Sequence, residues 1–221
     1  MKSQIIGALA ILLAVAAAPE LRAQSVGPEA GLVVDPRQLQ ASDAEVAVGE
    51  VLFSMPARYL RTGRLQNEIQ SNRRPWARSN SVPAGTPVFA QTFESLGTLW
   101  CAVSEWDGYR RSICFGTGRV YLGAPYAAPA LEPGFGIEEP AQIVEDSSAE
   151  FPPMEMVYTL DSWTRDSVRL SRGLRVDGFV YRLARLTVNR SENGSASINL
   201  NGRVVRFTQV DDDARVELVS R

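Results

Sequence analysis

The residues that could carry out chemistry in this chain are few, and the types that are missing narrow the choice of mechanism. The sequence contains no histidine, and its one lysine is Lys2. Without histidine the chain has no Ser-His-Asp or Cys-His nucleophile and no histidine ligand for zinc or haem. Without a lysine beyond Lys2 it has no Schiff base and no Walker-type phosphate lysine. Proton transfer is therefore left to carboxylates and tyrosines.

Carboxylate pairs can hydrolyse glycosidic bonds, and Glu105 and Asp107 are the candidates for such a pair. A tight turn accounts for Asp107, however, and Arg110 is an opposite-charge partner for Glu105. The three aspartates at 211–213 lack the spaced ligands of a calcium loop, which favours a solvated turn. We therefore expect no catalytic residue, metal site or cofactor. A carboxylate-dependent polysaccharide hydrolase is retained only as an alternative.

Cys101 and Cys114 are the only cysteines, and a β-hairpin would bring them face to face. Asp107-Gly108, between them, is a strong signal for a type I′ turn. Counting outward from this turn gives the cross-strand pairs Trp106 with Tyr109, Glu105 with Arg110, Val103 with Ser112, and Cys101 with Cys114. The cysteine pair is not hydrogen-bonded, so its Cα atoms should lie about 4.5 Å apart. The sequence therefore predicts a structural disulfide that staples the hairpin, with the opposite face toward the core.

The segment 72–78 is a candidate anion-binding site. It places Arg73, Arg74 and Arg78 around Trp76. Arginine presents a rigid fork to phosphate or carboxylate, and tryptophan suits boundaries that are partly apolar and partly wet. On a loop, these four residues could bind lipid head groups or cell-wall carboxylates. The alternative is a solvated loop with the tryptophan in the core.

The tip of the predicted hairpin is a second candidate for binding a partner. It carries Trp106, Tyr109 and Arg110. A disulfide-stapled tip is held in one conformation, which lowers the entropy cost of inserting it into a partner's cleft. An inhibitor that presents residues 106–110 is therefore an alternative function.

Residues 1–23 have the layout of a secretory signal peptide. Lys2 precedes an apolar run at 5–18, and small Ala23 precedes Gln24 at the expected cleavage point. The run of about 14 residues is shorter than the roughly 20 that span a bilayer as a helix. An uncleaved anchor is the alternative. We expect a periplasmic or secreted protein whose mature chain has no transmembrane segment, and export makes nucleic acid an improbable partner.

Charge is distributed in blocks along the chain. Residues 51–128 contain nine arginines and four acids, 129–161 contain eight acids and no base, and 162–221 contain eleven arginines and seven acids. An acidic, proline-rich block between two basic blocks suggests a linker between folded units. The expected organisation is a loosely ordered start at 24–43, an N-terminal β unit at 44–126, a linker at 127–156 and a C-terminal β unit at 157–221. One continuous β domain is the alternative.

Both units show short alternating apolar and polar segments separated by turn signals such as Asn201-Gly202. This pattern predicts a mainly β fold, with a small antiparallel barrel or sandwich-like unit that contains the stapled hairpin and a second, C-terminal β-meander. We expect an exported, non-catalytic β protein that binds or braces a component of the cell envelope or the extracellular space, with an anionic macromolecule as the partner.

Overall fold

The computed structural model describes residues 24–25, 31–42, 44–70, 81–106, 108–127 and 130–219. The predicted signal peptide at 1–23 lies outside these ranges. Within them the chain is almost entirely β, and its one helical element is the short 3₁₀ helix η1 (Pro36–Gln38). No helix within these described ranges has the length and apolar character needed to cross a bilayer. The predicted fold class is confirmed.

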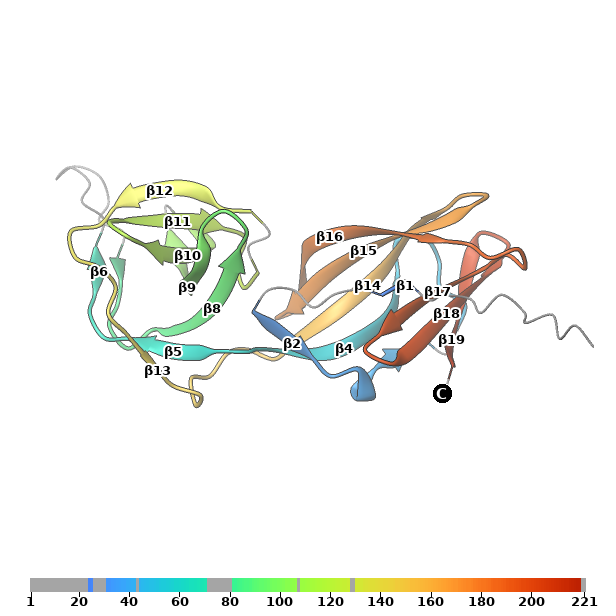
Figure 1. Cartoon of the computed structure of the whole chain (residues 1–221), viewed down its shortest axis with the longest axis horizontal. Coiled ribbons are helices and arrows are strands. Elements are labelled where there is room, and N and C mark those ends of the chain that lie inside the picture. Colours follow the sequence, from blue (N-terminus) through green and yellow to red (C-terminus); the bar gives the residue numbers. More distant parts are fainter. Residues whose placement is uncertain are drawn as a thin grey trace, which may run out of the picture.

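A seven-stranded antiparallel sheet forms the first lobe of the molecule, together with a two-stranded sheet (Figure 1). The strands of the larger sheet are β5 (Thr62–Leu65), β8 (Pro87–Phe93), β9 (Gly97–Trp106), β10 (Tyr109–Gly116), β11 (Arg119–Gly123), β12 (Glu132–Gly136) and β13 (Ile143–Glu145). They follow the order β12-β11-β10-β9-β8-β5-β13, and the sheet curls strongly. The small sheet pairs β6 (Ile69–Gln70) with β7 (Ser81–Val82).

The second lobe contains a six-stranded and a four-stranded sheet. The six-stranded sheet consists of β2 (Leu32–Val34), β3 (Gln40–Ala41), β4 (Val51–Tyr59), β14 (Met154–Trp163), β15 (Ser167–Val176) and β16 (Phe179–Asn189). Its order is β16-β15-β14-β4-β2, with β3 also paired to β4. The four-stranded sheet has the order β1-β17-β18-β19 and is formed by β1 (Gln24–Ser25), β17 (Ser195–Leu200), β18 (Arg203–Val210) and β19 (Asp213–Val219).

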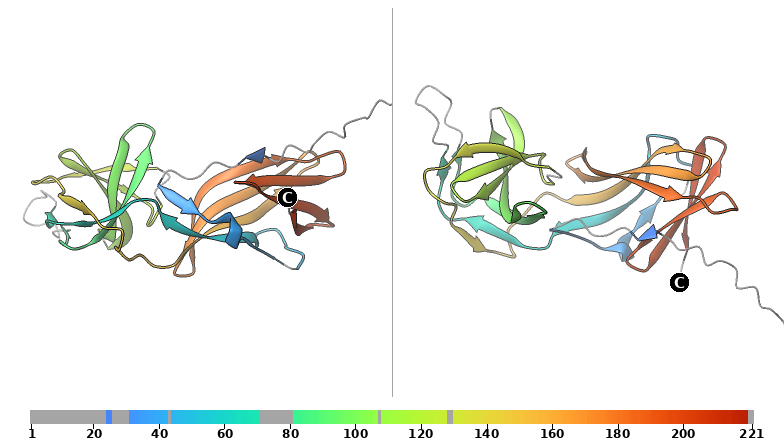
Figure 2. Two further views of the ribbon diagram at one scale, coloured as in Figure 1. Left: turned by 60° about the horizontal axis from the view of Figure 1, so that its bottom comes forward. Right: turned by 45° about the horizontal axis from the view of Figure 1, so that its top comes forward.

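The chain passes between the two lobes at two places that run side by side. Leu60 and Arg61 connect β4 to β5, and residues 146–153 lead from β13 back to β14. Figure 2 shows the same two-lobed shape from two further directions. The first lobe is therefore formed by one continuous stretch, 62–145, whereas the second lobe combines strands from 24–59 with strands from 154–219.

Two apolar clusters form the interior. The smaller lies inside the curled sheet of the first lobe and contains residues such as Leu65, Trp106 and Ile113. The larger fills the second lobe and continues into the first, where it includes Phe89 and the two cysteines. The lobes are consequently joined by buried apolar contacts as well as by the two chain crossings.

Tight turns set the register of the long hairpins. Asn201 and Gly202 have φ values of 51° and 93°, and they join β17 to β18 as the sequence predicts. Asp177 and Gly178 have φ values of 50° and 81° and connect β15 to β16. Both turns use the left-handed region that asparagine, aspartate and glycine tolerate best. The second turn leads directly into the strand β16.

The strand pairing differs from the grouping expected from the charge blocks. The segment 45–53, expected in the N-terminal unit, contributes to β4, which pairs with β14 in the second lobe. The predicted linker at 127–156 includes β12 and β13, which pair with β11 and β5 in the seven-stranded sheet. The charge blocks indicate which segments are exposed to solvent, whereas these strand pairings depend on long-range contacts between apolar side chains. A division into independently folding units stays a prediction.

Candidate functional site

The stapled hairpin has the predicted register. Trp106 pairs with Tyr109, and Cys101 pairs with Cys114 across β9 and β10. The two cysteines form a disulfide with their Cα atoms 3.9 Å apart. The hairpin face opposite the disulfide, which includes Ala102, packs inside the first lobe as expected.

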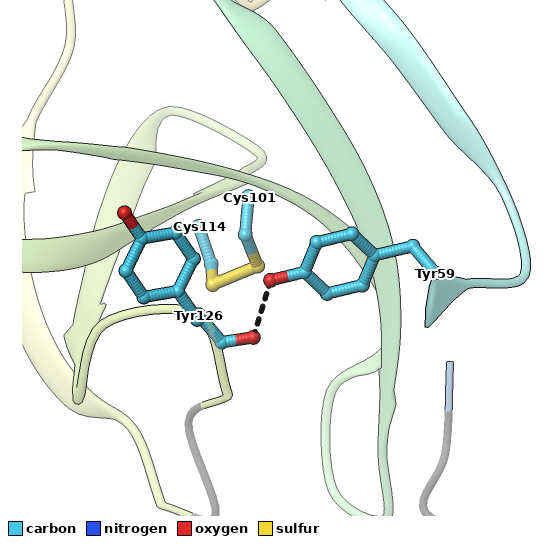
Figure 3. The surroundings of a disulfide bond; sticks show 4 residues. All are labelled: Tyr59, Cys101, Cys114 and Tyr126. Carbon is cyan, nitrogen blue, oxygen red and sulfur yellow. Dashed lines mark hydrogen bonds between the residues drawn. A yellow bond between two sulfur atoms is a disulfide. The ribbon is translucent and has the colours of Figure 1, made fainter. Parts of the chain in front are cut away.

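The disulfide on the other face of the hairpin is itself buried, and two tyrosines lie beside it (Figure 3). The hydroxyl of Tyr59 donates a 2.6 Å hydrogen bond to the main-chain oxygen of Tyr126. The Tyr59 ring stacks on Phe89 with a centroid distance of 4.0 Å. Burial raises the pKa of the Tyr59 hydroxyl well above its ordinary value. This tyrosine is therefore a neutral structural donor and is poorly suited to proton transfer.

The hairpin tip is not the exposed aromatic surface that the sequence suggested. The Trp106 side chain is 0% exposed and stacks on Phe135 at a centroid distance of 6.1 Å. It points into the curled sheet because the strand alternation that exposes its neighbours turns it toward the core. Tyr109 is 67% exposed. The expectation that Trp106 could enter a partner's cleft is thus corrected.

Arg110, the third residue of the predicted tip, contacts the second lobe. Although Arg110 lies opposite Glu105 in the register, its guanidinium lies 5.0 Å from the Tyr126 ring centroid and donates a hydrogen bond to the Tyr126 hydroxyl. It also forms a 3.6 Å ion pair with Asp177, in the β15–β16 turn. Burial raises the pKa of Tyr126, and the nearby Arg110 opposes that shift. The residue therefore joins the lobes, and the expected charge pair with Glu105 is replaced by the one with Asp177.

The predicted anion-binding residues Arg73, Arg74, Trp76 and Arg78 lie outside the described residues, as does Asp107. Their proposed role stays a prediction from the sequence.

The structure reveals another arginine-rich surface, on the outer face of the six-stranded sheet. Arg169 on β15 and Arg182 and Arg185 on β16 are exposed there and line one groove of about 630 Å³. The other residues around this groove are Val48, Gly49, Leu160, Asp161, Ser162, Leu186 and Thr187. We call the three arginines and this groove the arginine face.

A β-bulge places the arginines on one side of the sheet. Gly173 pairs with Arg182, but Arg172 pairs with Ala184, so Leu183 is an extra residue on β16. Without a bulge, residues 182 and 185 would point to opposite faces, because side chains alternate along a strand. The extra residue restores the alternation, and both guanidiniums face outward. A Cβ at Gly173 would lie 2.7 Å from a Val180 methyl group, so the strands approach closely at this point.

The positive charge of the arginine face is not neutralised by neighbouring acids. Among the described residues, no carboxylate lies within ion-pair distance of Arg169, Arg182 or Arg185. The one acid in the groove, Asp161, accepts a 2.7 Å hydrogen bond from the Ser171 hydroxyl. Three exposed guanidiniums against one carboxylate can bind phosphate or carboxylate groups through charge-assisted hydrogen bonds.

A second groove, of about 600 Å³, lies at the chain crossings between the lobes. Two arginines line it: Arg61 is paired with Glu145 and lies 5.2 Å from the Trp100 ring centroid, and Arg58 is exposed. Because Glu145 compensates one of these two charges, the crossing groove is a weaker candidate for an anion than the three arginines of the arginine face. Across the described part of the chain, no group of three or more acids or cysteines is arranged to hold a metal ion.

Comparison of the chain with known protein families, with curated proteins and with solved structures finds no match. The site therefore rests on its own geometry. Sequence reasoning missed the arginine face, although the arginine excess of residues 162–221 was a signal that this region is basic.

Proposed function

We propose that this chain is an exported, non-catalytic β protein that binds an anionic component of the cell envelope or the extracellular space through its arginine face. The observation that carries this proposal is the alignment of Arg169, Arg182 and Arg185 in one open groove, where none of the described carboxylates forms an ion pair with them. Because the whole chain has a formal charge of −2, this surface is a local concentration of positive charge rather than a consequence of overall basicity.

The disulfide and the N-terminal sequence support export. Disulfides persist in oxidising compartments and are rare in the cytosol. The Cys101–Cys114 bond is fully buried within the hairpin, and the apolar run at 5–18 precedes a small residue at 23. N-terminal sequencing of the natural protein should therefore begin near Gln24. Recovery of the intact chain, including Met1, from the cytosol would contradict export.

The inhibitor alternative required Trp106 at the surface, and the side chain is buried. No arrangement of the described carboxylates favours the hydrolase alternative. Binding of an anionic partner is therefore the function that the geometry supports best.

The test compares two double variants that remove equal charge. Arg182→Gln/Arg185→Gln alters the arginine face, and Arg119→Gln/Arg203→Gln alters two exposed arginines elsewhere. Binding to polyphosphate and to polygalacturonate is measured by titration at low and high salt, with the complete exported chain. We expect about thirtyfold weaker binding for the first variant only, since each of its two arginines contributes about 1 kcal/mol at an anionic surface.

The salt series separates a specific surface from general charge. Wild-type binding should weaken strongly as salt rises, because exposed charges are screened. Equal loss in both double variants would show that the location of the charge does not matter, and it would overturn the proposal. Absence of binding to either polymer by the wild type would overturn it as well.

A further inference from the structure

The hairpin that carries the arginine face ends in two exposed apolar side chains. Phe179 is 69% exposed and Val180 is 50% exposed, directly after the turn Asp177-Gly178. Large apolar side chains are usually buried, and an apolar pair at a projecting tip marks an interaction site when it adjoins a specific polar surface. In Figure 1 this turn lies where the second lobe faces the first.

Val180 of the apolar tip and the arginines lie on the same side of β16, whereas Phe179, which pairs with Val176, points to the other side at the end of the hairpin. Val180 pairs with Arg175 and Arg182 with Gly173, so both side chains of β16 lie on the outer face. Arg185 follows on that face after the bulge. At about 3.3 Å per residue, β16 passes from apolar tip to basic groove within about 15 Å. From its tip inward, the strand therefore presents apolar groups first and cationic groups second. A lipid surface presents the boundary of the acyl chains and the phosphates in the same order.

Acids near the tip do not cancel this pattern. Asp177, in the turn, is paired with Arg110 at 3.6 Å. Glu155, on the neighbouring strand, accepts a 2.8 Å hydrogen bond from Arg175. The guanidiniums of the arginine face therefore remain the uncompensated charges next to the apolar tip.

We propose that the partner is an anionic lipid surface, with Phe179 and Val180 entering the boundary between head groups and acyl chains while Arg182 and Arg185 contact lipid phosphates. This inference rests on the proposed function and names the partner of that site. Apolar insertion combined with charge attraction is the pattern of peripheral membrane binding, and the two contributions respond differently to salt. A soluble polyanion would use the arginines but would leave the apolar pair unused.

The test uses the complete exported chain and sedimentation with vesicles of phosphatidylcholine, with or without phosphatidylglycerol. Wild type should bind only the vesicles that contain phosphatidylglycerol. Phe179→Ser/Val180→Ser should weaken this binding about tenfold while leaving polyphosphate binding unchanged. The control Leu60→Ser/Val144→Ser removes two other exposed apolar side chains and should bind vesicles like wild type. Unfolding temperatures of both variants verify that the fold is retained.

Each other result contradicts the inference in a distinct way. Polyphosphate binding without vesicle binding would overturn the lipid partner and leave the proposed function standing. Absence of both vesicle binding and polyphosphate binding in the wild type would overturn the lipid partner and the proposed function together. Equal vesicle binding by the wild type and by the tip variant Phe179→Ser/Val180→Ser would show that the apolar pair does not insert. A dimer of the wild type that dissociates in the tip variant, with no vesicle binding, would assign the tip to a second copy of this chain instead.

Discussion

The hydroxyl of Tyr59 donates its hydrogen bond to the main-chain oxygen of Tyr126 from the last residue of β4, just before the chain crosses between the lobes. Tyr126 has a φ of 66°, in the left-handed region that a bulky side chain rarely adopts. The bond from Tyr59 and the contacts of Arg110 hold this conformation from two sides. The disulfide lies between the same two tyrosines (Figure 3).

Replacing Tyr59 with phenylalanine should destabilise the protein by about 1–3 kcal/mol, because a buried carbonyl oxygen loses its donor while the ring packing is kept. Urea unfolding monitored by fluorescence measures this free energy. Tyr109→Phe is the control, since Tyr109 is exposed. Equal stability of the Tyr59 variant and wild type would show that the hydrogen bond contributes nothing.

Removing the disulfide by Cys101→Ala/Cys114→Ala should lower the free energy of unfolding by roughly 2–3 kcal/mol, because the unfolded chain regains the entropy of a short closed loop. Protein purified without reductant should contain no titratable thiol after denaturation. One free thiol per cysteine in that assay would contradict the bond.

Local pairing rules were sufficient for the hairpin. The Asp107-Gly108 turn fixes a register in which every later pair follows by counting, so Cys101 and Cys114 could be matched from the sequence. The same local logic placed the Asn201-Gly202 turn. Long-range strand pairing could not be predicted in this way, because no local feature of β4 or β14 indicates that these two strands pair with each other.

The arginine face shows why the candidate site was missed. Strict alternation places residues 182 and 185 on opposite sides of a strand, and only the extra residue Leu183 brings them together. A single bulge has little signature in the sequence. Burial of Trp106, in contrast, follows from strand alternation alone, because Trp106 lies on the same hairpin face as Ala102, the face expected to point toward the core.

Asp146→Asn should make stability less dependent on pH in the acid range. Hydrogen bonds from the Ser148 hydroxyl and from Arg64 lower the pKa of Asp146 below its ordinary value of 3.8. A lowered pKa in the folded state stabilises the protein above the unfolded-state value, and the contribution is lost as the pH falls through the folded-state value. The variant should therefore be less stable than wild type at pH 7, and the difference should disappear in strong acid.

Unfolding curves between neutral and acid pH test this behaviour. Asp212→Asn, which changes an exposed aspartate, should have the same stability as wild type throughout. A stability difference for Asp146→Asn that is constant with pH would show that the charge of Asp146 is not involved.

The ion pair between Arg110 and Asp177 should couple the lobes only weakly. Both side chains are about half exposed, and pairs of this kind contribute about 0.2–1 kcal/mol. A double-mutant cycle with Arg110→Met and Asp177→Asn measures the coupling energy, which should decrease at high salt. A coupling well above 1 kcal/mol, or one that is insensitive to salt, would contradict this assignment.

Hydrogen exchange with and without a bound anionic partner tests the central claim most directly, because it locates the contact on the chain. With vesicles containing phosphatidylglycerol, or with polyphosphate, we expect slower exchange for backbone amides of β15 and β16 and unchanged exchange in β10 and β11. Protection confined to residues 71–80, or to the crossings between the lobes, would place the binding site elsewhere and contradict the assignment of the arginine face.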